Sequence, residues 1–183
     1  MNRYIRFLST FFAFAVMGLL SLQPALAATG HVLDQDAEAA LGALYSNHAG
    51  AKALGEKASG ILVFPSITKA GFIVGAQGGD GVLFEKGKRT GYYNSGAVSV
   101  GLQAGVQTYG YALFFMSPAD LAYLKKSSGW SLGVGPSIVV ADAGFGKDTS
   151  TTTLKSGVYA FIFDQKGLMA GMGVVGQKIT RIK

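Results

Sequence analysis

The chain has no cysteine, which excludes disulfides, thiolate metal sites and the lipid-carrying cysteine of a bacterial lipoprotein. Proline occurs only four times among 183 residues, and the glycines follow no three-residue period, so a collagen-like chain is excluded. Charged side chains make up 14% and hydrophobic side chains 49% of the sequence, and this balance excludes a disordered chain. The composition therefore indicates a folded domain without thiol chemistry.

Residues suited to catalysis or metal binding are also scarce. The two histidines, His31 and His48, have no carboxylate at ligand spacing, and no G-x-S-x-G nucleophile elbow is present. The glycine cluster at 75–81 has the wrong spacing for a dinucleotide loop. The cluster at 144–149 has Asp148 where a phosphate loop needs serine or threonine. We therefore expect a non-enzymatic protein with no cofactor and no metal.

Residues 1–27 have the pattern of a Sec signal peptide. Arg3 and Arg6 precede an apolar stretch, and Ala27 ends an A-x-A cleavage site. The apolar stretch is short for a membrane span, although an uncleaved anchor helix is the alternative. We expect cleavage after Ala27, which leaves residues 28–183 as a single domain that is periplasmic or secreted.

The charge of the chain is mildly positive. Without the signal peptide, the excess of basic over acidic side chains falls from six to four. Such an excess suits an anionic membrane surface. Nucleic acid is not expected as a partner, because exported proteins rarely meet it and no recognition motif is present. We expect peripheral association with a membrane and no covalent lipid anchor.

Residues 28–58 are expected to form a helical N-terminal region. Apolar residues recur at helical spacing from Leu33 to Leu44, and a break is expected at 47–50. Three acidic residues lie near the start of this pattern, where the helix dipole favours negative charge. They are Asp34, Asp36 and Glu38.

Residues 59–183 are expected to form a β-rich core. The clearest strand runs from Val98 to Gln107, where apolar residues alternate with small or polar ones. Gly105 and Gly110 are the expected bend points of this strand. Turns are expected at 78–81, 86–88 and 164–167, one inserted helix at 117–126, and further strands at 61–64, 71–77, 82–84, 137–141, 154–165 and 168–175. The predicted fold class is α+β, with a curved, mostly antiparallel, barrel-like sheet on which the N-terminal helices and the inserted helix pack.

Four separated segments carry a family pattern in the expected order. They are ASGILVFPSITKAG at 58–71, GGDGVL at 78–83, SVGLQAG at 99–105 and FDQKGLMAG at 163–171. Together they resemble the SYLF-domain family, and the resemblance covers about residues 35–182, nearly all of the expected mature chain.

The resemblance implies a lipid-binding module. Eukaryotic members of the family bind phosphoinositides, and some also bind and bundle actin, whereas bacterial members are exported and described as lipid-binding. Two departures matter here: the lipid-attachment cysteine is absent, and the N-terminal helix is alanine-rich and acidic, which makes it a weak membrane inserter. We therefore do not carry over actin or phosphoinositides, and we expect a preference for anionic phospholipids.

The expected function is lipid binding at an envelope membrane surface through basic residues and a helix edge. Each basic group near an anionic surface contributes about 1 kcal/mol. A structural or stress-related domain that binds an envelope protein is the alternative. A small outer-membrane barrel is less favoured, because the chain contains helices and does not end in an aromatic residue. The expected headgroup-binding residues are Lys69, Lys86, Lys88, Arg89, Lys125 and Lys126.

Overall fold

The computed structural model describes residues 23–126, 129–132, 134–141, 157–167 and 177–182. The chain divides into two compact units, residues 1–32 and residues 33–183, and the features below belong to the second. The strand expected at 168–175 lies outside the described residues, and so do residues 1–22 of the expected signal peptide. The last residues before the expected cleavage after Ala27 belong to a helix that begins at Gln23.

Three helices are described: α2 (Gln23–Asn47), α3 (Ala49–Gly55) and α4 (Pro118–Lys126). The break expected at 47–50 is confirmed, because His48 is extended, with φ of −135°, and separates α2 from α3. The prediction that the three acidic residues lie near the start of the helix was wrong. Since α2 begins at Gln23, these residues lie in its interior and its first turn carries no acid.

The inserted helix α4 is confirmed, and local chemistry explains its start. The Ser117 hydroxyl accepts a hydrogen bond from the Asp120 backbone N–H at 3.1 Å and donates one to the Asp120 carboxylate at 2.6 Å. Pro118 occupies the first helical position, where its missing N–H costs nothing. The helix packs against the sheet through its two buried residues, Leu121 and Leu124.

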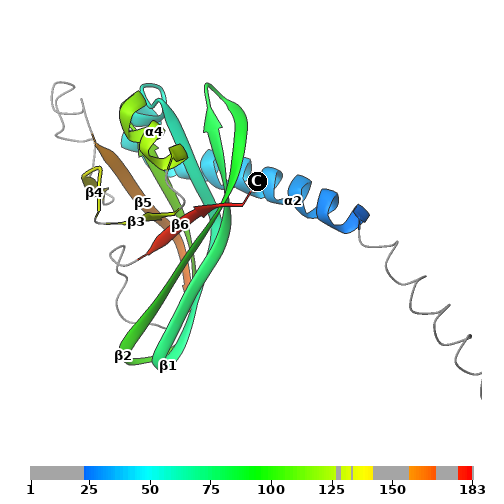
Figure 1. The fold of residues 1–183 in the computed structure, drawn as a ribbon, viewed down its shortest axis with the longest axis vertical. Helices are drawn as coiled ribbons and strands as arrows, with labels where there is room; N and C mark the ends of the chain where they lie inside the picture. Colours follow the sequence, from blue (N-terminus) through cyan, green and yellow to red (C-terminus); the bar gives the residue numbers. More distant parts are fainter. Residues whose placement is uncertain (1–22, 127–128, 133, 142–156, 168–176, 183) are drawn as a thin grey trace, which may run out of the picture. The chain divides into compact units, whose positions relative to one another are not determined.

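The strands are β1 (Gly60–Glu85), β2 (Lys88–Phe115), β3 (Trp130–Ser131), β4 (Ile138–Ala141), β5 (Val158–Gly167) and β6 (Lys178–Arg181). They form one six-stranded sheet with the order β3-β6-β2-β5-β4, and β1 pairs with β2. All pairs are antiparallel except β4 with β5. The sheet is curled into a half-barrel, so the predicted α+β fold class is confirmed (Figure 1).

The long β1–β2 hairpin folds back on itself at its middle. A side chain at Gly71 would collide with the backbone of Gly75, and Gly105, on the partner strand, has a φ of +135°. Beyond this bend, Gly79 lies against the carbonyl oxygen of Ser66. The expected bend at Gly105 is therefore confirmed, and the long green and teal strands of Figure 1 show the resulting layers.

The turn expected at 78–81 was wrong. Residues 78–81 continue β1, and each pairs with a residue of β2. Gly79 and Gly81 allow the second half of β1 to pack closely on its first half. A side chain at Gly81 would lie 2.5 Å from a ring carbon of Phe64. The turn expected at 86–88 is confirmed: Lys86 and Gly87 have φ of 51° and 73°, as a two-residue hairpin of type I′ requires.

Two hydrophobic cores lie on opposite faces of the curled sheet. The inner core fills the concave side and also receives α4. The outer core lies between the convex side and the helices, through residues such as Leu44 of α2 and Leu54 of α3. The largest buried members of the inner core are Trp130, Tyr93, Tyr111, Phe64 and Phe115, and the aromatic members of the outer core include Phe84, Phe114, Phe161 and Phe163. Among the described residues, no helix has the length and apolar content needed to cross a bilayer.

Candidate functional site

The β1–β2 turn, the end of α3 and α4 bring basic side chains to one end of the sheet. Lys86 and Lys88 are exposed at the turn, with Glu85 paired to Lys88 across it. Lys125 of α4 reaches this turn and contacts Glu85. We refer to Lys57, Lys86, Lys88, Arg89, Lys125 and Lys126 as the basic end.

A surface pocket of about 440 Å³ opens within the basic end. Three of its lining residues are lysines, from the turn after α3, the β1–β2 turn and α4, and Glu85 is its one carboxylate. Sites that bind small molecules have volumes of roughly 300–1,000 Å³, so the pocket is large enough for a lipid headgroup. The lining residues are Lys57, Ala58, Ser59, Glu85, Lys86, Pro118, Leu121, Ala122 and Lys125.

Glu85 is held by the residues around it. The Lys125 ammonium lies 2.7 Å from its carboxylate, and the Thr90 hydroxyl donates a hydrogen bond to it. Partial burial raises the pKa of Glu85, but the hydrogen bonds from Lys125 and Thr90 and nearby positive charge outweigh burial and leave its pKa below the usual value. Glu85 is therefore ionised at neutral pH and neutralises Lys125, which leaves Lys57 and Lys86 as the excess charge of the pocket.

A second pocket of about 400 Å³ shares Ala58 and Lys86 with the first. It is mainly apolar and opens between the helices and the outer face of β1. Its other lining residues are Leu41, Tyr45, Gly55, Glu56, Gly60, Ile61, Phe84 and Gly87. A pocket with three lysines and a pocket with one lysine and mostly apolar neighbours thus adjoin at Lys86, an arrangement that suits an amphiphilic molecule.

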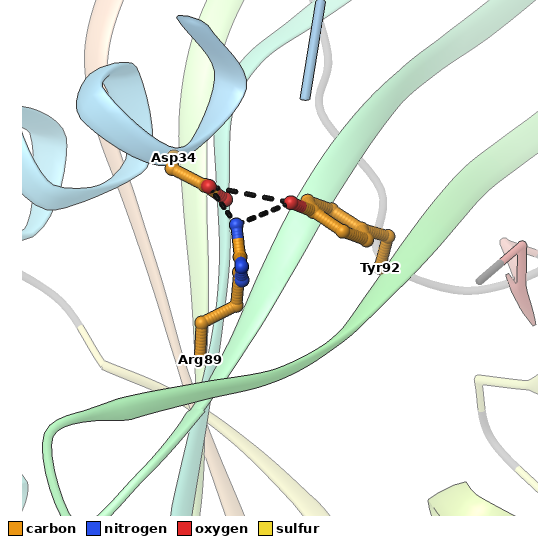
Figure 2. A network of polar contacts seen from close by, with 3 residues as sticks. All are labelled: Asp34, Arg89 and Tyr92. Carbon is orange, nitrogen blue, oxygen red and sulfur yellow. Dashed lines mark hydrogen bonds and ion pairs between the residues drawn. The ribbon is translucent and has the colours of Figure 1, made fainter. Parts of the chain in front are cut away.

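Arg89 has a different role from the lysines beside it. Figure 2 shows its guanidinium between the Asp34 carboxylate of α2 and the Tyr92 hydroxyl of β2. It donates to the Tyr92 hydroxyl at 2.7 Å, and that hydroxyl donates to Asp34 at 3.2 Å. Burial raises the pKa of Tyr92, and the hydrogen bond to Asp34 and its negative charge raise it further. Arg89 of β2 therefore links α2 to the sheet through its ion pair with Asp34.

The Asp34–Arg89 pair is expected to contribute about 1 kcal/mol to stability, because Asp34 is largely covered but Arg89 is half exposed. A double-mutant cycle with Asp34→Asn and Arg89→Gln, measured by urea unfolding, checks this. Asp36→Asn removes an exposed carboxylate from the same helix and is expected to change stability by less than about 0.5 kcal/mol. Equal effects of Asp34→Asn and Asp36→Asn would show that the contact in Figure 2 contributes nothing.

The structure brings five of the six sequence-predicted residues to the basic end. Lys69 is the exception: its side chain lies on the inner face of the sheet, is 5% exposed, and is paired in register with Gln107. Lys57 was missed by sequence reasoning. It lies inside the helical region expected at 28–58, directly before the segment ASGILVF that begins the family pattern, and the turn after α3 places it at the pocket.

The described residues also hold no cluster of three His, Asp or Glu side chains that could bind a metal ion.

Residues 96–183 match the model of the family described as "Ysc84: Las17-binding protein actin regulator". No curated protein matches the chain. The matched range contains the segments at 99–105 and 163–171 on which the resemblance partly rests, and it includes the β2 side of the bend, α4 and β5. The match over residues 96–183 confirms the resemblance of the sequence to the SYLF-domain family, because the domain of the Ysc84 family is the SYLF domain.

Proposed function

We propose that this protein is a non-enzymatic lipid-binding module that acts at a membrane surface of the cell envelope, which it reaches by export and cleavage after Ala27. The observation that carries the proposal is the basic end, where lysines from the turn after α3, the β1–β2 turn and α4 surround one pocket. A second, apolar pocket adjoins it at Lys86. Anionic phospholipids, with a phosphate headgroup and acyl chains, have the matching chemistry.

The charges of the basic end are available for this role. Among the described residues, Lys57, Lys86, Lys88 and Lys126 form no ion pair, whereas Arg89 and Lys125 are engaged with acidic partners. At about 1 kcal/mol for each basic group near an anionic surface, four lysines give a usable and salt-sensitive affinity. The helix edge in this proposal is the end of α3, because the exposed side of α2 carries Asp36 and Glu38.

The test is co-sedimentation of residues 28–183, which contain the whole second compact unit, with liposomes. Neutral phosphatidylcholine is compared with mixtures that contain phosphatidylglycerol or cardiolipin, at low and high salt. Removing two charges with Lys86→Gln and Lys88→Gln is expected to weaken binding to the anionic mixtures at low salt about tenfold or more. Arg89 is left intact because its replacement would also disturb α2.

The matched control is the pair Lys166→Gln and Lys178→Gln, which removes the same charge from exposed positions on β5 and β6. The proposal expects a smaller loss from this pair than from Lys86 and Lys88. Equal losses would show that only net charge matters and would contradict the assignment of the basic end. Absence of binding to anionic liposomes at either salt would contradict lipid binding there and favour an envelope protein partner.

A further inference from the structure

The outer face of the sheet is apolar beneath the helices and again near the bend, and the hydrogen-bonded pair Asp80 and Asn94 lies on this face between the two regions. Near the β1–β2 turn, Val82 and Phe114 on this face are buried in the outer core beneath the helices. Towards the bend, the same face continues with Val74, Val98 and Val106, which are 58%, 76% and 59% exposed. Exposed alanines flank them, and β1 pairs Ala70 with Val106 and Ala76 with Val98. We call Ala70, Val74, Ala76, Val98 and Val106 the bend surface.

The inner face at the same level is polar and buried. Ser95, Gln107 and Gln177 are 0%, 6% and 2% exposed, and each has a side-chain atom without a hydrogen-bond partner. Buried polar atoms are nearly always paired in soluble folds, so three orphans on one side of a sheet are unusual. Gln77 lies on the same face and accepts a hydrogen bond from Tyr109 at 3.3 Å. The inward face thus changes from apolar near the turn to polar near the bend.

This orientation is reversed relative to a sheet surrounded by water. A half-buried soluble sheet places apolar residues inward and polar residues outward. A sheet in contact with hydrocarbon does the opposite, because its outward side chains meet lipid. The bend end has the second pattern, with valines outward and glutamine and serine inward.

The segments of β1 and β2 that form the bend also contain no charged residue. In β1, no charged residue occurs between Lys69 and Asp80. In β2, no charged residue follows Arg89, and the next one in the chain is Asp120 of α4. Charged groups are costly in hydrocarbon, so a segment that enters a bilayer must lack them on every side. A protein partner or a second copy of the chain would require this only on the face it covers. The bilayer is therefore the occupant that the pattern favours.

From these observations we infer that the bend of the β1–β2 hairpin enters the boundary between headgroups and acyl chains of a lipid bilayer, with the bend surface in contact with hydrocarbon. The contact is shallow, because an open sheet has backbone groups at its edges that must stay hydrogen-bonded. The inference does not rest on the proposed function of the basic end. About ten residues of β1 at about 3.3 Å each place the two features roughly 30 Å apart, so they are separate contacts.

The test uses the absence of cysteine from the chain. Val98→Cys places one thiol on the bend surface, and Val139→Cys places one on β4, where the wild-type valine is 43% exposed. Each variant of residues 28–183 is labelled with a polarity-sensitive dye and mixed with neutral phosphatidylcholine vesicles at high salt. We expect a blue shift and quenching by shallow lipid-attached nitroxides at position 98 only. No change at 98, or equal changes at both positions, would overturn the inference.

A second measurement covers the case in which the label itself causes insertion. Val74→Thr, Val98→Thr and Val106→Thr keep side-chain shape and strand preference but lower hydrophobicity, and together they are expected to weaken binding to neutral vesicles about tenfold or more. The matched control replaces three other exposed valines, Val134, Val139 and Val140, with threonine. Equal binding of the two triple variants would overturn the inference.

Two further controls separate this inference from other outcomes. Lys86→Gln with Lys88→Gln is expected to leave insertion at position 98 unchanged at high salt, so failure of the basic end and failure of the bend are distinguishable. A dye shift that appears without vesicles and grows with protein concentration would show that a second copy of the chain covers the bend surface, and it would overturn the bilayer contact.

Discussion

Replacing Gly81 with alanine is expected to lower the free energy of unfolding by about 3 kcal/mol or more. The new methyl group would lie 2.5 Å from a ring carbon of Phe64 and 2.7 Å from the carbonyl oxygen of Val63. The oxygen belongs to the backbone of β1, which is fixed by its pairing with β2, so relief requires the two layers of the folded hairpin to separate. Urea unfolding, followed by the fluorescence of the single buried tryptophan, Trp130, measures the change.

Gly42→Ala is the matched control for this substitution. A methyl group at Gly42, in the described part of α2, would meet no atom within 4 Å. Alanine is favoured over glycine in a helix by about 0.8–1.0 kcal/mol, so this variant is expected to be more stable than the wild type. The same chemical change thus has opposite signs at the two sites. If Gly81→Ala were as stable as the wild type, the close packing of the two halves of β1 would be contradicted.

This contrast shows why part of the fold was predictable from the sequence. The serine and proline before α4 and the Lys-Gly step after β1 act through local backbone chemistry, and both were predicted at the right positions. Gly79 and Gly81 act through contacts with residues about fifteen positions earlier. A sequence pattern contains no information about that distance, so the same residues were interpreted as a turn.

The candidate site was predictable to a similar extent. Lys86 and Lys88 were identified because a turn exposes its charged residues, and the structure exposes them. Lys69 was included for its charge, although the bulge between Phe64 and Ile67 sets the phase of β1 that directs it inward. Lys57 was not recognised because it comes close to Lys86 only when α3 packs beside the turn. Individual charges can be read from the sequence, but their grouping around a pocket depends on tertiary structure.

The outer core offers the second large effect. Phe114→Ala is expected to lower the free energy of unfolding by about 3–5 kcal/mol. Phe114 is fully buried, packs edge-on against Phe161 of β5 at a ring-centroid distance of 5.4 Å, and contacts Tyr45 of α2 at 6.4 Å. It therefore joins α2 to the sheet, and its removal leaves a cavity between them. Urea unfolding of the variant measures the loss.

Native-state hydrogen exchange shows where this loss occurs. Because Phe114 faces the helices and Phe115 faces the inner core, Phe114→Ala is expected to accelerate exchange in α2 and α3 more than in α4. Phe115→Ala removes a ring of the same size from the opposite face, where it contacts Trp130 at 5.8 Å, and is expected to act first on α4. Identical exchange patterns in the two variants would show that the two cores unfold as one unit. Distinct patterns would mean that the helices beside the basic end can loosen while the folded hairpin, with its bend surface, stays intact.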